Sequence, residues 1–162
     1  MLSDEQKYLI RELNSYNYLH QKLYDMTETY AHSLRYIDEK IKEIDMKLNE
    51  YHVPSISYDS ISVSSVPSTK NSRALELINE QDTLRKRKLQ LEETQHKEVE
   101  KITSRIDDIN LMINKLNRWE YQYIHDMYII PKGIDFMMDN YHYSRTYVFK
   151  KATILLEKML KK

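Results

Sequence analysis

The chain has 162 residues, and its 25 Lys or Arg are balanced by 25 Asp or Glu, so the formal net charge is zero. It contains one glycine, three prolines and no cysteine. The missing cysteine excludes disulfide frameworks, cysteine-based zinc sites and thiol nucleophiles, and a single glycine leaves little for dinucleotide- or phosphate-binding loops. Because residues that break helices are scarce, we expect an all-α protein with long helices.

The N-terminal segment MLSDEQKYLI lacks a basic stretch followed by an apolar core, so we expect no signal peptide. No apolar run approaches the ~20 residues that a bilayer-spanning helix needs. We therefore expect a cytoplasmic protein without a membrane partner.

The first fifty residues repeat apolar side chains at alternating steps of three and four. The members of this repeat are Leu23, Met26, Tyr30, Leu34, Ile37, Ile41, Ile44, Leu48 and Tyr51, preceded by Leu9, Leu13, Tyr16 and Leu19. Such a repeat is typical of a coiled-coil seam, here with one extra step of four between Met26 and Leu34. Ser3 and Asp4 are candidate N-caps, and the pattern predicts a helix that ends near Glu50.

Residues 52–71 contain seven serines, Pro54 and Pro67, and no Lys or Arg before Lys70. Prolines at these positions exclude a continuous helix. Alternating apolar residues between Ile56 and Val63 are compatible with a short extended segment. We favour a plain connector over a phosphorylation or docking segment.

A second long helix is predicted from a cap at Ser72 to about Leu116. Its last third has a regular apolar seam, from Val99 to Leu116, whereas Asp82, the basic run Arg85 to Lys88 and Glu92 interrupt the middle. Leu77, Leu84 and Leu91 keep a seven-residue period, offset from that seam. Two helices of similar length most simply form a long antiparallel helical hairpin, a coiled coil over residues 1–117. We expect it to form a homodimer or small homo-oligomer, with pairing within one chain or between two.

Aromatic residues cluster after Asn117, where we predict three short helices: Arg118 to Tyr128, Ile134 to Tyr141 and Ser144 to Leu160. The last helix opens after Tyr141-His142-Tyr143-Ser144, a tight turn that ends in a good N-cap. A short helix, a tight turn and a capped longer helix predict a helix-turn-helix DNA-binding domain over residues 118–162.

Local charge agrees with an anionic partner, because six Lys or Arg face one acidic residue from Ser144 onward. Val148, Ala152, Leu155 and Met159 form the expected buried stripe of the last helix. The candidate base-contacting residues are Arg145, Thr146, Phe149 and Lys150. Tyr147, Lys151 and Lys158 are the candidate phosphate contacts.

The stretch from Leu116 to Leu160 resembles the C-terminal domain of phage late-gene regulators of the ArpU and RinA type. The resemblance rests on Ile124, Met127, Tyr128 and Ile129, followed at ungapped spacing by Tyr143-Ser144-Arg145. It implies a helix-turn-helix similar to the sigma-factor domain that reads the −35 element, and a host-cell cytoplasmic location. It further implies double-stranded DNA and RNA polymerase as partners at a phage or prophage late promoter. The chain departs from the family pattern at Met138, Tyr141 and Lys151.

The sequence thus predicts a sequence-specific transcriptional regulator, with activation and repression equally open. The alternatives are a coiled-coil adaptor that does not bind DNA and a DNA-packaging subunit of the small-terminase kind. The basic run Arg85 to Lys88 is a second candidate DNA surface, although such runs are usually solvated. The six histidines lack metal-ligand spacing, and no acidic pair indicates catalysis. We therefore expect no metal, no cofactor and no enzymatic activity.

Overall fold

The computed structural model describes residues 2–51 and 69–161, with the side chains of residues 69–71 left aside. Within these ranges the chain is all-helical, as predicted. The expected extended segment between Ile56 and Val63 lies outside the described residues. None of the described helices combines the length and apolarity needed to cross a bilayer.

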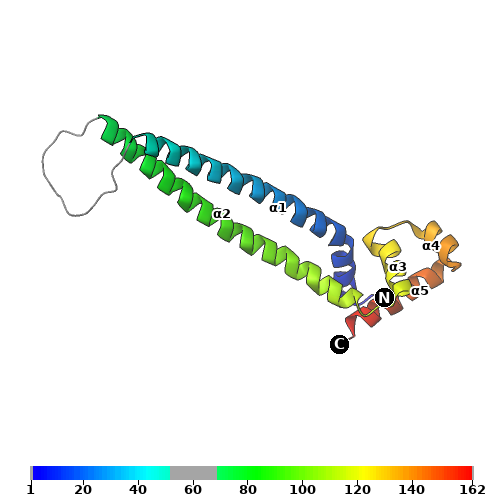
Figure 1. Ribbon diagram of the computed structural model, residues 1–162. Helices are drawn as coiled ribbons and strands as arrows, with labels where there is room; N and C mark the ends of the chain where they lie inside the picture. Colours follow the sequence, from blue (N-terminus) through cyan, green and yellow to red (C-terminus); the bar gives the residue numbers. More distant parts are fainter. Residues whose placement is uncertain (1, 52–68, 162) are drawn as a thin grey trace. The chain divides into compact units, whose positions relative to one another are not determined.

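Two long helices precede four short helical elements (Figure 1). The long ones are α1, Asp4–Glu50, and α2, Thr69–Ile113. The short ones are α3, Arg118–Ile124, the π-helix η1, His125–Ile129, α4, Ile134–Tyr141, and α5, Arg145–Leu160. Helix α2 therefore begins three residues before the predicted cap at Ser72, and α4 has the predicted bounds.

Helix α1 begins at a reciprocal cap between Ser3 and Gln6. The Gln6 backbone N–H donates to Ser3 Oγ at 3.1 Å, and the Ser3 N–H donates to Gln6 Oε1 at 2.8 Å. This capping box satisfies two backbone donors that the first helical turn leaves without partners. Ser3 is thus the N-cap, while Asp4 is the first helical residue.

The chain divides into two compact units. We call Met26–Glu98 the hairpin unit, and Met1–Asp25 together with Val99–Lys162 the C-terminal unit. Each unit contains a stretch of α1 packed against a stretch of α2. The C-terminal unit also contains all four short elements.

In the hairpin unit, α1 and α2 run antiparallel. Tyr30 bonds to Glu98 and Lys88 bonds to Asp38, at 2.7 Å each, and Gln81 donates to Asp45. Partner numbers in α2 fall as those in α1 rise, which defines the antiparallel direction.

These pairs explain the middle of α2, where polar residues interrupt the predicted apolar seam. Leu77 is buried, Leu84 and Leu91 are half-buried, and Gln81 and Lys88 lie between them. Asp82 and Glu92, which we expected to interrupt the seam, are exposed. The seam therefore alternates leucines with polar residues that have partners on α1.

The C-terminal unit encloses a denser core. Its buried apolar side chains come from both long helices and from every short element: Leu9, Leu13, Leu19, Ile102, Ile106, Ile109, Tyr123, Ile124, Ile129, Met137, Val148, Ala152, Leu155, Leu156 and Met159. A bidentate ion pair links Arg105 to Glu12, and Tyr16 OH donates to Asn110 Oδ1 at 2.6 Å. These contacts join the beginning of α1 to the end of α2.

The predicted helix from Arg118 to Tyr128 is present as an unbroken helical stretch to Ile129, but its second half is a π turn and not an α-helix. Helix α3 ends at Ile124, and a π-helical turn follows, in which the Ile130 N–H donates to the His125 carbonyl oxygen at 2.8 Å. A π turn accommodates one more residue than an α turn and is often associated with a special side-chain environment. Here that environment surrounds the carboxylate of Asp126.

Candidate nucleic-acid interface

The turn between α4 and α5 is closed by local backbone contacts. His142 adopts the left-handed conformation with φ 53°, and the backbone N–H of Tyr143 donates to the Met138 carbonyl oxygen at 3.1 Å. This bond is the outer one of the Schellman motif. Ser144 then takes an extended conformation, and its Oγ accepts from the Tyr147 N–H at 3.4 Å. The predicted cap at Ser144 is confirmed.

Helix α5 is anchored by its apolar stripe and by a hydrogen bond from Tyr123. Val148, Ala152, Leu155, Leu156 and Met159 are buried, four of them as predicted and Leu156 in addition. The buried Tyr123 hydroxyl donates to the Val148 carbonyl oxygen at 2.9 Å. Burial of this phenol raises the pKa of Tyr123 well above its usual range.

The end of α5 is held by a lysine from the segment that follows α2. Lys115 Nζ donates to the carbonyl oxygens of Met159, at 2.8 Å, and of Lys161, at 2.6 Å. A cation at a helix C-terminus interacts favourably with the helix dipole and with carbonyl groups that lack intrahelical partners. Both ends of α5 are therefore fixed.

The face of α5 opposite the buried stripe is exposed to solvent. Arg145, Thr146 and Lys150 are exposed, and Phe149 keeps 46% of its surface accessible. All four predicted base-contacting residues are accessible. Thr146 and Lys150 lie opposite the buried stripe, whereas Arg145 and Phe149 precede Ala152 and Leu156 at helical steps and lie at an edge of that stripe. The nearby Thr153 is half-buried, and its hydroxyl donates to the Phe149 carbonyl oxygen at 3.0 Å.

The three predicted phosphate contacts have different surroundings. Tyr147 is exposed at the beginning of α5, and Lys151 is half-buried. Lys158 forms an ion pair with Glu120, with Nζ 2.6 Å from Oε2, so its charge is already neutralised. Burial would raise the pKa of Glu120, but bonds from Lys158 and from the Asn117 backbone N–H hold this pKa below its usual range.

Sequence reasoning missed a buried carboxylate beneath α4. Asp126 is 2% exposed and accepts hydrogen bonds from Gln122 Nε2 at 3.0 Å, Lys132 Nζ at 3.0 Å and Tyr141 OH at 2.9 Å. His125 Nδ1 lies 3.2 Å from the same carboxylate. The network links η1 to both the beginning and the end of the α4 region.

The polar groups around Asp126 stabilise its ionised carboxylate. Burial alone would raise the pKa of this carboxyl, but the hydrogen bonds from Lys132, His125 and Tyr141 outweigh it and hold the pKa below its usual range. Burial and the same carboxylate raise the pKa of Tyr141. The available signal was a single acidic residue between Ile124 and Ile129 in an otherwise apolar stretch, but its partners cannot be read from spacing.

Other charged surfaces add little to this site. Arg85, Lys86 and Arg87 are exposed in the hairpin unit, while Lys88 is paired with Asp38. Across the described ranges no group of three or more His, Asp or Glu side chains is arranged to hold a metal ion.

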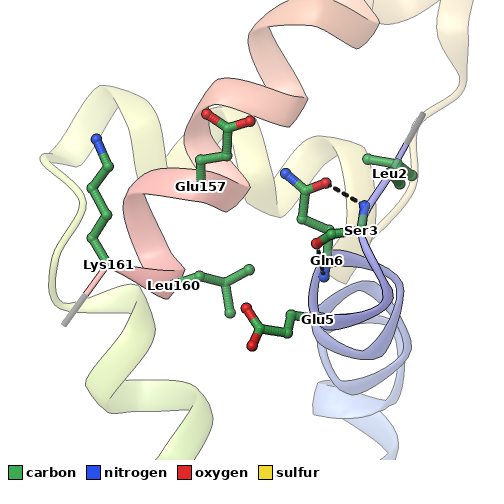
Figure 2. Close-up of a pocket in the computed structure, with 7 residues that line it drawn as sticks. All are labelled: Leu2, Ser3, Glu5, Gln6, Glu157, Leu160 and Lys161. Carbon is green, nitrogen blue, oxygen red and sulfur yellow. Dashed lines mark hydrogen bonds between the residues drawn. The ribbon is translucent and has the colours of Figure 1, made fainter.

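An open groove of about 630 Å³ lies between the first turn of α1 and the end of α5 (Figure 2). It is lined by Leu2, Ser3, Glu5, Gln6, Glu157, Leu160 and Lys161. Ser3 and Gln6 are already bonded to each other in the α1 cap. The remaining polar residues of its lining are Glu5, Glu157 and Lys161.

Comparisons of the chain with protein-family models, with curated proteins and with solved structures return no match. What remains for function is the chemistry of the exposed face of α5. The accessible part of α5 presents two cations, a hydroxyl and an aromatic ring on a helix whose buried stripe and both ends are anchored.

Proposed function

We propose that the protein is a sequence-specific double-stranded DNA-binding regulator, with α4 and α5 forming a helix-turn-helix and α5 as the recognition helix. One observation supports this proposal above the others. Arg145, Thr146, Phe149 and Lys150 are all accessible in the first turns of α5, Thr146 and Lys150 opposite the buried stripe and Arg145 and Phe149 at its edge.

The side-chain chemistry suits the edges of bases. A major groove about 12 Å wide admits an α-helix, and Arg and Lys favour the O6 and N7 acceptors of guanine. Thr146 and Phe149 offer apolar contact to a thymine methyl group. Arg145 occupies the first position of α5, where recognition helices commonly meet bases.

Phosphate contacts would set the affinity. Tyr147 and Lys151 are available, whereas Lys158 must first leave Glu120. With about five phosphates neutralised by the basic C-terminal region, we expect the logarithm of the binding constant to fall with the logarithm of salt concentration at a slope near −4 to −5.

The regulatory role follows from the resemblance to phage late-gene regulators. In this proposal the protein acts with RNA polymerase at a phage or prophage late promoter, as an activator or a repressor, and binds as a homodimer or small homo-oligomer. Two-fold symmetry of such an assembly predicts a palindromic operator with half-sites spaced by helical turns of DNA.

The test is selection of bound sequences from a random duplex pool at about 150 mM salt. Wild type is run beside the Arg145→Ala/Lys150→Ala double variant. A matched control is Arg11→Ala/Lys101→Ala, which removes the same two residue types from exposed positions on α1 and α2 of the same unit. We expect an enriched motif with wild type and with the control, and its loss with the recognition-helix variant.

Two results would contradict this assignment. Equal enrichment by the recognition-helix variant would remove Arg145 and Lys150 from base readout. Weak binding that disappears with salt, without any enriched motif, would leave only electrostatic attraction and refute sequence-specific recognition.

The second candidate is a coiled-coil adaptor, which the long antiparallel pairing of α1 with α2 in the hairpin unit favours. An adaptor would oligomerise without affinity for duplex DNA at low salt. A DNA-packaging subunit would instead bind duplex and sediment as a ring of many copies.

A further inference from the structure

A series of aromatic rings connects α3 with the beginning of α5. The Trp119 ring lies 5.6 Å from Tyr123 and 5.8 Å from Tyr141, and the Tyr143 ring lies 4.6 Å from Tyr147. The members at the two ends stay accessible, Trp119 at 43% and Tyr147 at 42%. Trp119 thus keeps a large part of its indole accessible next to the candidate recognition helix.

Trp119 also contacts a cation from α5. The ammonium of Lys151 lies 5.1 Å from the centroid of the Trp119 ring, within the range of a cation–π interaction. No ion pair of the described residues includes Lys151, and none includes the exposed Arg118. Lys158, in contrast, is paired with Glu120. Lys151 is thus held over the Trp119 ring, and its charge also contributes to the lowered pKa of Glu120.

Lys151 lies on a side of α5 that is well placed for contact with a DNA strand. Tyr147, Lys151 and Ile154 follow one another at steps of four and three, so they line one flank of α5, beside the face of Thr146 and Lys150. A helix with its side chains is about 10–12 Å wide, and it nearly fills a major groove of about 12 Å. The flank of an inserted helix therefore lies against a wall of phosphates.

From this geometry we propose that Trp119 and Lys151 together contact the phosphate backbone, a role that rests on the proposed binding of double-stranded DNA. The ammonium of Lys151 neutralises a phosphate, the indole N–H donates to a phosphate oxygen, and the indole ring positions the ammonium. The site is thereby extended from α5 to α3. Neither the turn nor the resemblance that predicted the site draws Trp119 into it.

Trp119 is the single tryptophan of the chain, so the test uses its own fluorescence. The full-length protein is titrated with a 20-base-pair random-sequence duplex labelled for anisotropy, and both signals are recorded at several salt concentrations. The variants are Trp119→Phe, which keeps an aromatic ring but removes the N–H, and Lys151→Ala. Lys101→Ala, at an exposed position of α2, is the matched control.

We expect tryptophan fluorescence to change and to saturate at the same duplex concentration as the anisotropy. Lys151→Ala should weaken binding about three- to tenfold for every duplex sequence and reduce the salt slope by about one, as expected for a phosphate contact. Trp119→Phe should weaken binding by a smaller factor without changing that slope. Lys101→Ala should bind as wild type does.

Different failures separate the two proposals. Duplex binding with unchanged tryptophan fluorescence, and with Lys151→Ala equal to Lys101→Ala, overturns the role of this pair and leaves the recognition helix standing. Absence of duplex binding by wild type at low salt overturns the proposed function and this inference together. Circular dichroism of each variant shows whether a loss of binding reflects a loss of fold.

Discussion

The hairpin unit and the C-terminal unit are built from stretches of the same two long helices, yet they bury side chains very differently. In the hairpin unit, the described side chains that become buried are Ile37, Ile44, Ala74, Leu77 and Gln81. In the C-terminal unit, Leu9, Leu13, Tyr123, Met137 and Leu156 are each completely inaccessible. The same kind of apolar repeat therefore gives a half-buried seam in one unit and a closed core in the other.

The difference shows what two helices alone can enclose. Side chains between two helices stay accessible along both edges of the seam, so polar groups such as Lys88 and Gln81 are tolerated there with their partners. In the C-terminal unit α3, α4 and α5 supply the surfaces that exclude water, and apolar burial contributes roughly 25 cal/mol per Å². We expect the stability of the fold to be concentrated where a third layer of helices is present.

The largest predicted effect contrasts one leucine from each unit. Leu156→Ala leaves a cavity in a closed core and should reduce the free energy of unfolding by about 2–5 kcal/mol. Leu91→Ala removes a half-buried leucine from the seam and should cost well under half as much. Urea denaturation followed by Trp119 fluorescence for the first variant and by circular dichroism for both measures the difference. Equal losses would mean that the seam is enclosed by something beyond the two helices.

A second prediction concerns Asp126. Asp126→Asn removes the charge that Lys132 and Tyr141 contact and should lower the free energy of unfolding at pH 7 by about 1–3 kcal/mol. The pKa of Asp126 is depressed in the folded state. The ionised carboxylate therefore makes its full contribution to the free energy of unfolding above the ordinary pKa of an aspartate, near 4. This contribution is lost as the pH falls through the lower pKa of the folded state.

The measurement is urea denaturation of wild type and Asp126→Asn at pH 7 and at pH 3. The gap between the two should narrow at the lower pH. Asp139→Asn, an exposed carboxylate on α4, is the control and should change the free energy of unfolding little. A gap that stays constant with pH would show that the loss in Asp126→Asn comes from packing and not from charge.

Among the residues that the structure describes, Gly133 and His142 have positive φ, and substitutions at these two positions should have opposite effects on stability. Gly133 has φ 89° and ψ 159°, a region that is essentially restricted to glycine, so Gly133→Ala should destabilise by about 1–3 kcal/mol. No atom lies within 4 Å of the added Cβ, so the cost is one of backbone conformation. His142→Gly relieves the left-handed conformation of a non-glycine residue and should stabilise by up to about 1 kcal/mol. Thermal unfolding of both variants should show shifts of opposite sign.

The smallest effect on stability is expected in the polar part of the seam. Lys88→Leu replaces a half-buried, paired lysine by an apolar residue, and the free energy of unfolding should change by less than about 1 kcal/mol, in either direction. Partner choice should change more, since polar residues at seam positions specify register and oligomeric state. Analytical ultracentrifugation should show additional, larger species. An unchanged sedimentation profile would mean that Lys88 has no part in specificity.

Most of the helices could be predicted because the relevant signals are local. The caps at Ser3 and Ser144, the prolines after Tyr51 and the bounds of α4 follow from a few neighbouring residues each. The middle of α2 was harder, since Lys88 appears incompatible with a seam until its partner Asp38 is known. The π turn after Ile124 was missed, and so were the contacts of Asp126 within it, which reach residues up to fifteen positions away.

For the candidate site, the sequence indicated which α5 residues are accessible but not what they touch. Periodicity assigned the buried stripe and hence the opposite side of α5, with Thr146 and Lys150, while Arg145 was placed in the first turn. It gave no indication that Glu120 neutralises Lys158 or that Trp119 lies under Lys151, because both contacts join helices that are separated along the chain. The apolar period of a helix indicates which of its side chains are accessible, whereas the partners of those side chains depend on the tertiary fold.

The π turn at His125–Ile129 has a consequence for chain length. A π turn is how a helix accommodates one additional residue while the flanking segments keep their places. Deletion of a single residue here would restore an uninterrupted α-helix and rotate Asp126 away from Tyr141 and Lys132. The number of residues between Trp119 and Ser144 therefore cannot change in this turn without loss of the contacts of Asp126. Substitutions in this stretch will be tolerated more readily than insertions or deletions.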